Sequence, residues 1–221
     1  MTNIPLDLPS YLDLEQFISD EAHDLRSPFN QIIGFSKLLL NDVGAAYPAD
    51  LQKEDLGTVY RNGQRALLLM NGLIDMARLN RHEKEINPTE LEIKTLLDQS
   101  VSYWRKTNPA ATLQPTVQIT TLASHLSADE LALRQILASF IMVVAQYIDP
   151  QGTVTITVEE EPAWFIFKVA SAGKKVQPLS QLDLRMQGYL GRAMIDLQQG
   201  EVRLAEETED GASLQFALPK A

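Results

Sequence analysis

His23 is the residue of this chain whose type and neighbours best suit chemistry. It begins a short polar run, His23-Asp24-Leu25-Arg26-Ser27-Pro28. A neutral imidazole, with an unperturbed pKa near about 6.5, is a competent nucleophile at the pH of a cell. Asp24 can accept a hydrogen bond from the imidazole N–H, which orients the ring and supports the charge that develops during attack. This arrangement favours a histidine that carries a phosphoryl group on a ring nitrogen.

The same residues also have plain structural interpretations. His23 could be an exposed histidine on a helix surface, and Asp24 could be a solvated helix carboxylate. Arg26 could meet a phosphate or a partner carboxylate, or it could form an ion pair within its own helix. Pro28 removes one backbone donor, so we expect it to kink the helix just after His23 rather than to end it.

Two long amphipathic helices are expected to position His23. Apolar residues at helical spacing predict the first over about residues 11–42. Asp50 is expected to cap the second, which must end before Pro88. Joined by a short loop, they form an antiparallel hairpin within residues 1–87. A lone hairpin cannot bury both faces, so we expect a homodimer that completes a four-helix bundle.

The remainder, residues 88–221, mixes helices and strands. The periodicity predicts helices over residues 94–105, 129–148 and 182–199, and strands over 116–121, 124–126, 154–159, 163–169, 201–206 and 212–218. Gly200 stands where it can close the last helix in a left-handed cap, and Asp210-Gly211 can turn a hairpin. The predicted fold class is α+β: a helical hairpin, then an α/β sandwich with helices on one face of a sheet.

Composition narrows the possible partners and compartments. The net charge is -10, which disfavours nucleic acid and anionic membranes as partners because both reward clustered Lys and Arg. The chain has no cysteine, which excludes disulfides and thiolate catalysis. No apolar run approaches the roughly 20 residues that a bilayer crossing needs, and the first residues do not read as a signal peptide. We therefore expect a cytoplasmic protein.

The chain resembles the two-component sensor histidine kinases over nearly its whole length. The run from His23 to Pro28 is similar to that family's H-box, usually written H-E-L-R-T-P. Leu79-Asn80-Arg81 and Asn87-Pro88 match the hinge after the dimerisation hairpin. The final strand resembles the family's G-S-x-F-x-F-x-L-P ending, here Gly211-Ala212-Ser213-Leu214-Gln215-Phe216-Ala217-Leu218-Pro219. The resemblance implies that residues 88–221 form an α/β sandwich of the histidine-kinase ATPase type.

The chain departs from the family at the residues that would hold ATP. Ser139 and Val143 stand where two Asn residues would face Mg²⁺ and the phosphates. The adenine-reading D-x-G-x-G turn is replaced by Ser171-Ala172-Gly173-Lys174-Lys175, and in the phosphate loop only Gly191 falls in register. Triphosphate binding needs a divalent ion with oxygen ligands and backbone donors that glycine brings close. We therefore expect no bound cofactor and no metal ion on this chain.

These observations favour a phosphorelay protein of the histidine phosphotransferase type over an ATP-dependent kinase. His23 would exchange a phosphoryl group with a response-regulator receiver domain, which would supply Mg²⁺. Asp24 would orient the ring and Arg26 would meet the phosphate. Ser27 stands where the family carries Thr or Asn. The resemblance implies that the side chain at this position places a water molecule when the protein acts as a phosphatase.

Two other functions stay open at this point. The chain could be a catalytically silent module that pairs with an active histidine kinase. As such a module it could regulate that kinase, or the kinase could phosphorylate it in trans. It could also be a true kinase with an atypical nucleotide site.

Overall fold

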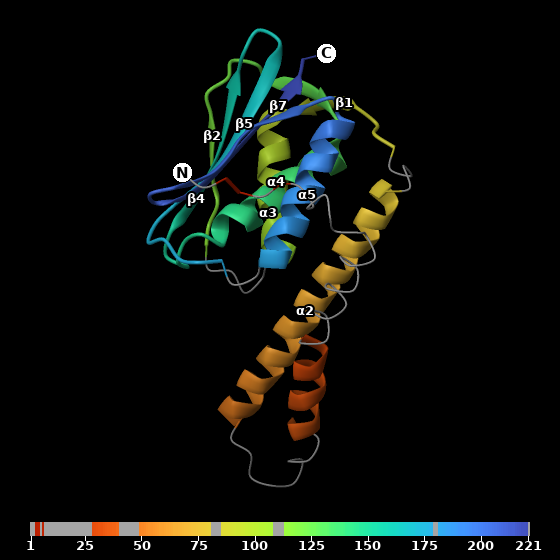
Figure 1. Cartoon of the computed structure of the whole chain (residues 1–221), viewed down its shortest axis with the longest axis vertical. Coiled ribbons are helices and arrows are strands. Elements are labelled where there is room, and N and C mark those ends of the chain that lie inside the picture. The colour runs from red at the N-terminus through yellow and green to blue at the C-terminus, as the bar shows by residue number, and fades with distance from the viewer. Residues whose placement is uncertain are drawn as a thin grey trace. The chain divides into compact units, whose positions relative to one another are not determined.

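The computed structural model describes residues 3, 4, 6, 28–39, 49–80, 85–107, 113–178 and 181–220. The chain divides into two compact units (Figure 1). One consists of Pro9–Ala77 and is called here the helical hairpin. The other joins Met1–Leu8 to Arg78–Ala221 and is called the α/β unit.

The helical hairpin contains two helical stretches, as the periodicity predicted. Residues 28–39 are helical, and α2 spans Ala49–Asn80. The helix α2 begins one residue before the predicted cap Asp50, because Ala49 is itself a strong helix former. The helix spans residues up to Asn80, and residues 85–88 carry no regular structure, as expected from the position of Pro88. The predicted kink beside His23 falls on residues outside the described ones.

A five-stranded sheet forms one layer of the α/β unit, in the order β2-β4-β5-β7-β6. Only β2 and β4 pair in parallel, and the other neighbours are antiparallel. The strands are β2 Thr116–Ile119, β4 Thr153–Glu160, β5 Trp164–Ala172, β6 Glu201–Thr208 and β7 Gly211–Pro219. The predicted hairpin of the last two strands is confirmed.

Three helices cover one face of this sheet, which confirms the predicted sandwich (Figure 1). They are α3 Ile93–Thr107, α4 Glu130–Ala145 and α5 Gln181–Leu197. A second sheet of two short strands, β1 Thr89–Glu92 and β3 His125–Ala128, lies beside them. The sequence analysis missed β1, because Leu91 is its only apolar residue and one residue sets no alternation. No helix in the described ranges combines the length and apolar character that a bilayer crossing requires.

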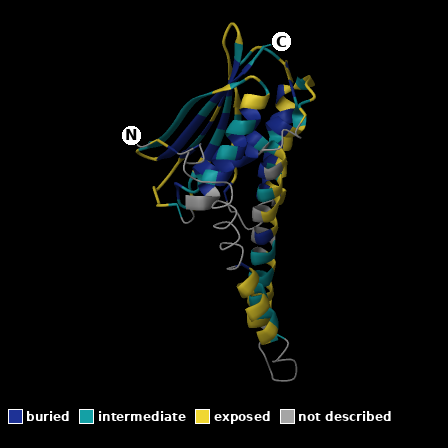
Figure 2. Cartoon of the chain, turned by 45° about the vertical axis from the view of Figure 1, so that its right-hand side comes forward, coloured by how far each residue is buried: buried dark blue, intermediate teal, exposed yellow. Residues whose placement is uncertain are grey.

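The core lies between the sheet and the helices. Strand β4 alternates as predicted, with Val154, Ile156 and Val158 fully buried. Phe167 stacks on Phe216 at 4.9 Å between ring centroids. Figure 2 shows the resulting concentration of buried residues in the α/β unit. This core is built from the domain's own side chains.

Two predicted helix ends prove wrong. The left-handed residue after α5 is Gln199, with φ of 57°, and not Gly200. Gly200 serves a close approach instead, because a Cβ there would lie 2.5 Å from the Ala217 carbonyl oxygen. The helix α4 ends at Ala145, before the predicted residue 148, because Ile148 already pairs in a β-bridge with Lys175.

Candidate functional site

The predicted phospho-acceptor residues His23, Asp24, Arg26 and Ser27 lie outside the described residues. Their roles therefore stay predictions. The structure describes the helical hairpin that follows these residues. It also describes the region of the α/β unit that the resemblance assigns to the family's nucleotide site.

The two helical stretches of the hairpin contact each other at Gly63. A Cβ added at Gly63 of α2 would lie 3.9 Å from Cδ1 of Ile32 in the facing stretch, which is ordinary contact. Elsewhere the hairpin exposes large apolar side chains at spacings of three, four and seven residues along α2. Figure 2 shows exposed residues along this helix. We call these the apolar seam: Leu56, Tyr60, Leu67, Met70 and Ile74. Such spacing is typical of a helix that packs against another helix.

The helices α4 and α5 are joined by a buried polar contact at Ser139, one of the two positions that the resemblance aligns with the family's Asn residues. The Ser139 hydroxyl donates a hydrogen bond to Oε1 of Gln187 over 2.9 Å. Ser139 is 8% exposed and Gln187 is 5% exposed. Val143, at the second of the two positions, is fully buried and its side chain has no oxygen. The one hydroxyl at these positions is therefore already engaged inside the protein.

Phe140 closes the same interface against α5. A Cβ added at Gly191 would lie 2.4 Å from Cε1 of Phe140, so the aromatic ring packs directly on the glycine backbone. Phe140 also packs edge-on to Phe216, at 5.6 Å between centroids. In the sequence alignment, Gly191 falls in register with the family's phosphate loop. In this structure the Phe140 ring packs against Gly191.

Ser171 stands at the adenine-reading position, and its side chain is turned to a neighbouring strand. Its hydroxyl accepts a hydrogen bond from the Ala212 N–H over 3.0 Å, and it is 5% exposed. Gly211 makes this contact possible, because its φ of 152° favours glycine and an added Cβ would lie 2.6 Å from the Ser171 hydroxyl. Ser171 therefore holds β5 to β7.

Lys175, at the second glycine position of the same turn, also binds within the domain. Its ammonium pairs with Glu207 at 2.9 Å and donates to the Thr208 carbonyl at 3.2 Å. Glu207 has a second neighbour in Tyr147, after α4. Burial raises the pKa of Tyr147 to about 12, and the negative charge of Glu207 adds to the effect. The turn is thus fastened to the β6–β7 hairpin.

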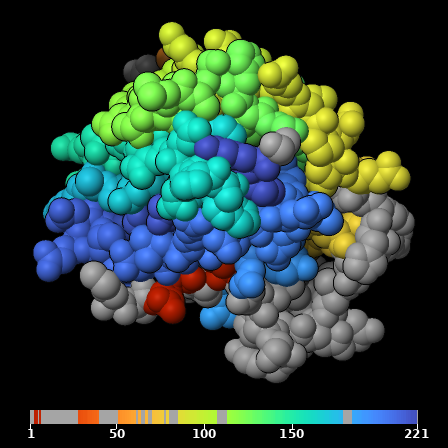
Figure 3. Space-filling view, turned by 90° about the horizontal axis from the view of Figure 1, so that it is seen from above, coloured from red at the N-terminus to blue at the C-terminus, as the bar shows by residue number. Residues whose placement is uncertain are grey.

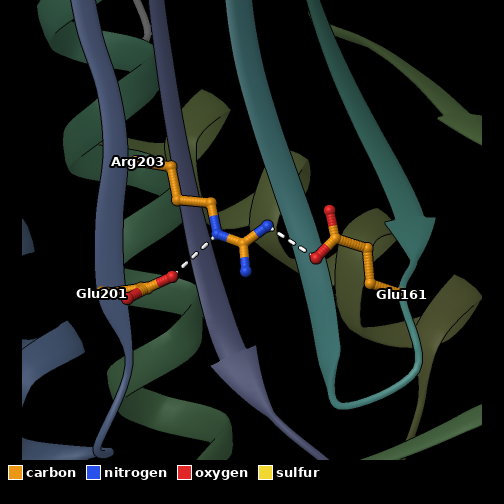
Figure 4. A network of polar contacts seen from close by, with 3 residues as sticks. All are labelled: Glu161, Glu201 and Arg203. Carbon is orange, nitrogen blue, oxygen red and sulfur yellow. Dashed lines mark hydrogen bonds and ion pairs between the residues drawn. The ribbon is translucent and has the colours of Figure 1, made fainter.

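The outer face of the sheet is held by an arginine that reaches across strands (Figure 4). Arg203 on β6 contacts Glu161 at 2.7 Å, beyond β7 in the strand order, and Glu201 at 2.9 Å. Its guanidinium lies 5.6 Å from the centre of the Trp164 ring. The hydrogen bonds that Arg203 donates, first to Glu161 and also to Glu201, raise the pKa of Arg203. This network braces the sheet.

Sequence reasoning located the positions but missed their contacts. It identified Ser139, Val143 and Ser171 as departures from the family, and predicted a loss of ligands there. It did not foresee that Gln187 would pair with Ser139. A weak signal existed: a buried helix that offers a serine needs an acceptor, and Gln187 interrupts an otherwise apolar face of α5.

Comparison with known proteins agrees with both halves of the chain. Residues 13–82 match the His Kinase A (phospho-acceptor) domain. The circadian input-output histidine kinase CikA of Synechococcus elongatus is 21% identical over 93% of this chain and 30% of its own length. The chain spans between 27% and 37% of the length of the first three curated relatives that it matches.

Solved structures show the same fold. The histidine kinase AdeS of Acinetobacter baumannii superposes with a TM-score of 0.67 at 15% identity, covering 90% of this chain and 98% of that one. The histidine kinase ThkA, in complex with the response regulator protein TrrA, also has a TM-score of 0.67, at 18% identity over 94% of this chain and 62% of that one. The chain thus combines a His Kinase A (phospho-acceptor) domain with an ATPase-like sandwich, and over most of its length it is similar to two-component sensor histidine kinases.

Proposed function

We propose that this signalling protein passes a phosphoryl group between His23 and the aspartate of a response-regulator receiver domain, and that its α/β unit does not bind ATP. The observation that carries the proposal is the internal engagement of the nucleotide positions. Ser139 bonds to Gln187, Ser171 to Ala212 and Lys175 to Glu207. A nucleotide would have to displace these contacts and move the Phe140 ring from Gly191.

The transfer needs little chemistry from the chain itself. A neutral ring nitrogen of His23 attacks the phosphorus of the receiver's aspartyl phosphate. The P–N bond forms as the P–O bond to the aspartate breaks, and the carboxylate leaves. Asp24 accepts a hydrogen bond from the other ring N–H and offsets the positive charge on the imidazole. Arg26 offsets charge on the phosphoryl oxygens. Mg²⁺ on the receiver would supply further charge neutralisation.

The apolar seam supports a second part of the proposal, a dimer. Leu56, Tyr60 and Leu67 are each more than half exposed. Pairing of two hairpins into a four-helix bundle would cover them. A receiver would then dock on the helices below His23. ThkA, which has this fold, forms a complex with a response regulator protein, and this supports such docking.

The alternative is a silent module that binds a partner histidine kinase. The same seam favours it, because an exposed apolar stripe on a helical hairpin fits another hairpin of the family as well as a second copy. An ATP-dependent kinase is the third possibility, and the occupied nucleotide positions weigh against it.

Phosphotransfer from charged receivers separates the three. Purified chain is mixed, without ATP, with phosphorylated receiver domains of the same organism, and label on the chain is measured. We expect acid-labile label on the wild type and on His125→Gln, a control at an exposed histidine of β3, but none on His23→Ala. No label from any receiver would favour the silent module. Labelling by Mg-ATP alone would overturn the proposal in favour of a kinase.

A further inference from the structure

The first residues of the chain extend the sheet of the α/β unit. Asn3 forms an antiparallel bridge with Glu206 on β6, and the Ile4 N–H donates to the Ala205 carbonyl over 3.0 Å. β6 is the last strand on its side of the five-stranded sheet. We call Asn3, Ile4 and Leu6 the N-terminal strap. Figure 3 shows these residues in red beside the blue residues of the C-terminal strands.

Apolar side chains hold the strap in this place. Ile4 is 3% exposed and Leu6 is 6% exposed, and both belong to the hydrophobic core of the α/β unit. The strap also forms one wall of a groove of about 450 Å³, whose other walls are β6 and the Arg192 and Asp196 region of α5. Its attachment therefore combines backbone pairing with buried apolar contact, as in strand addition to a sheet edge.

The chain is fastened to the α/β unit again after the hairpin. The Asn87 N–H donates to Oδ2 of Asp129 over 2.9 Å. The other oxygen of Asp129 accepts from the Ala132 N–H at 2.7 Å and caps α4. The Asp129 N–H in turn donates to Gln198 after α5, at 2.9 Å. Asp129 thus ties the connection that follows the hairpin to two helices.

We infer that the helical hairpin is an insertion held to the α/β unit at both of its ends, and that the strap restrains movement between the units. The compact α/β unit comprises Met1–Leu8 as well as Arg78–Ala221. One connection alone lets two units turn about it, whereas two connections permit only the motions that both allow. Release of the strap from β6 would remove that restraint. This inference does not depend on the proposed phosphotransfer.

A disulfide trap tests the position of the strap. The chain has no cysteine, so Asn3→Cys with Glu206→Cys introduces one defined pair. Residues opposite each other in an antiparallel pair lie within reach of a disulfide. We expect mild oxidation to crosslink this variant within one chain. The control pair Asn3→Cys with Glu201→Cys lies about 17 Å further along β6, at about 3.4 Å per residue, and should stay reduced. Equal crosslinking of both pairs, or of neither, would overturn the docking.

Distance measurements between the units test the restraint. Nitroxide labels at Glu54→Cys on α2 and Lys168→Cys on β5, both exposed positions, report the spread of separations. We expect Ile4→Asp with Leu6→Asp to broaden the distance distribution by about twofold or more, since singly connected units sample many orientations. Ile4→Val with Leu6→Met should leave it unchanged.

An unchanged distribution in the aspartate variant, with its circular dichroism intact, would refute the restraint. If that variant unfolds, Ile4→Ala with Leu6→Ala takes its place in the same measurement, because it removes apolar surface without burying a charge.

Discussion

Ser139 on α4 donates a hydrogen bond to Gln187 on α5, and both side chains are almost completely buried. The contact joins two helices that cover the same face of the sheet. Ser139 is one of the residues that the sequence analysis aligned with the family's Asn positions. A polar pair of this kind stabilises a domain only while both partners are present.

Removing one partner should therefore cost stability. Ser139→Ala leaves the buried Oε1 of Gln187 without its donor, and we expect the free energy of unfolding to fall by about 1–3 kcal/mol. Urea denaturation followed by circular dichroism measures the change. The m-value should stay the same, because the exposed area on unfolding does not change.

The double variant Ser139→Ala with Gln187→Met is the control for this pair. Once both polar groups are gone, no buried oxygen is left unpaired, so the double variant should lose less stability than the two single losses added together. Strict additivity would mean that the hydrogen bond contributes nothing.

Gly191→Ala tests whether Phe140 fills the interface. A methyl group at position 191 would lie 2.4 Å from Cε1 and 2.9 Å from Cδ1 of Phe140. We expect overpacking to cost about 1–3 kcal/mol, reduced by up to about 1 kcal/mol because alanine favours the helix. Thermal unfolding measures the net loss.

Phe140→Leu in the same chain should recover part of that loss, since the smaller side chain makes room for the methyl group. If Gly191→Ala were instead folded and as stable as the wild type, the Phe140 ring could move away at no cost. The interface between α4 and α5 would then be open to a ligand.

The apolar seam should control self-association. Leu67 is 53% exposed and lies in the middle of the seam. Leu67→Arg would place a charge in the proposed bundle, so we expect the dissociation constant of the dimer to rise by about tenfold or more. A tenfold rise corresponds to about 1.4 kcal/mol. Sedimentation velocity over a concentration series measures it.

Glu54→Arg, at an exposed polar position of α2, is the matched control and should leave the dimer intact. A monomeric wild type at every concentration would rule out the homodimer and direct attention to a partner kinase as the second hairpin.

Much of the fold could be predicted because the spacing of apolar residues and the residues typical of turns indicate the same elements. The β6–β7 hairpin combines two alternating strands with a turn before Gly211, and the structure has both. The errors arose where tertiary contacts decide. Gly200 looks like a helix cap, but β7 passes so close that only glycine fits there, and Gln199 takes the left-handed conformation instead.

The candidate site divides in the same way. Missing ligands can be read from residue types, so Val143 and Ser171 were identified without coordinates. The contacts that the substituted residues make instead depend on residues far along the chain. Ser139 bonds to Gln187, and Ser171 bonds to Ala212. The strap is a similar case, since nothing in a short N-terminal segment specifies the strand edge on which it docks.

Tyr147 predicts how the α/β unit responds to alkali. Its pKa is raised from 10.0 to about 12 in the folded protein, by burial first and by Glu207 second. An unfolded chain releases this proton near pH 10, whereas the folded chain retains it. The stabilisation is therefore complete below about pH 10 and is lost as the pH rises through about 12. The free energy of unfolding should fall less steeply over this window in Tyr147→Phe than in the wild type.

Urea titrations at fixed pH values between 9 and 12 give the two slopes. Tyr103→Phe on α3, where the side chain is exposed, controls for the general effect of replacing a tyrosine and should follow the wild type. The difference between the slopes of wild type and Tyr147→Phe reports Tyr147. Parallel plots of unfolding free energy against pH for Tyr147→Phe and wild type would mean that water reaches the phenol of Tyr147. The ion pair between Lys175 and Glu207 would then hold the turn less tightly over this side chain than the contacts indicate.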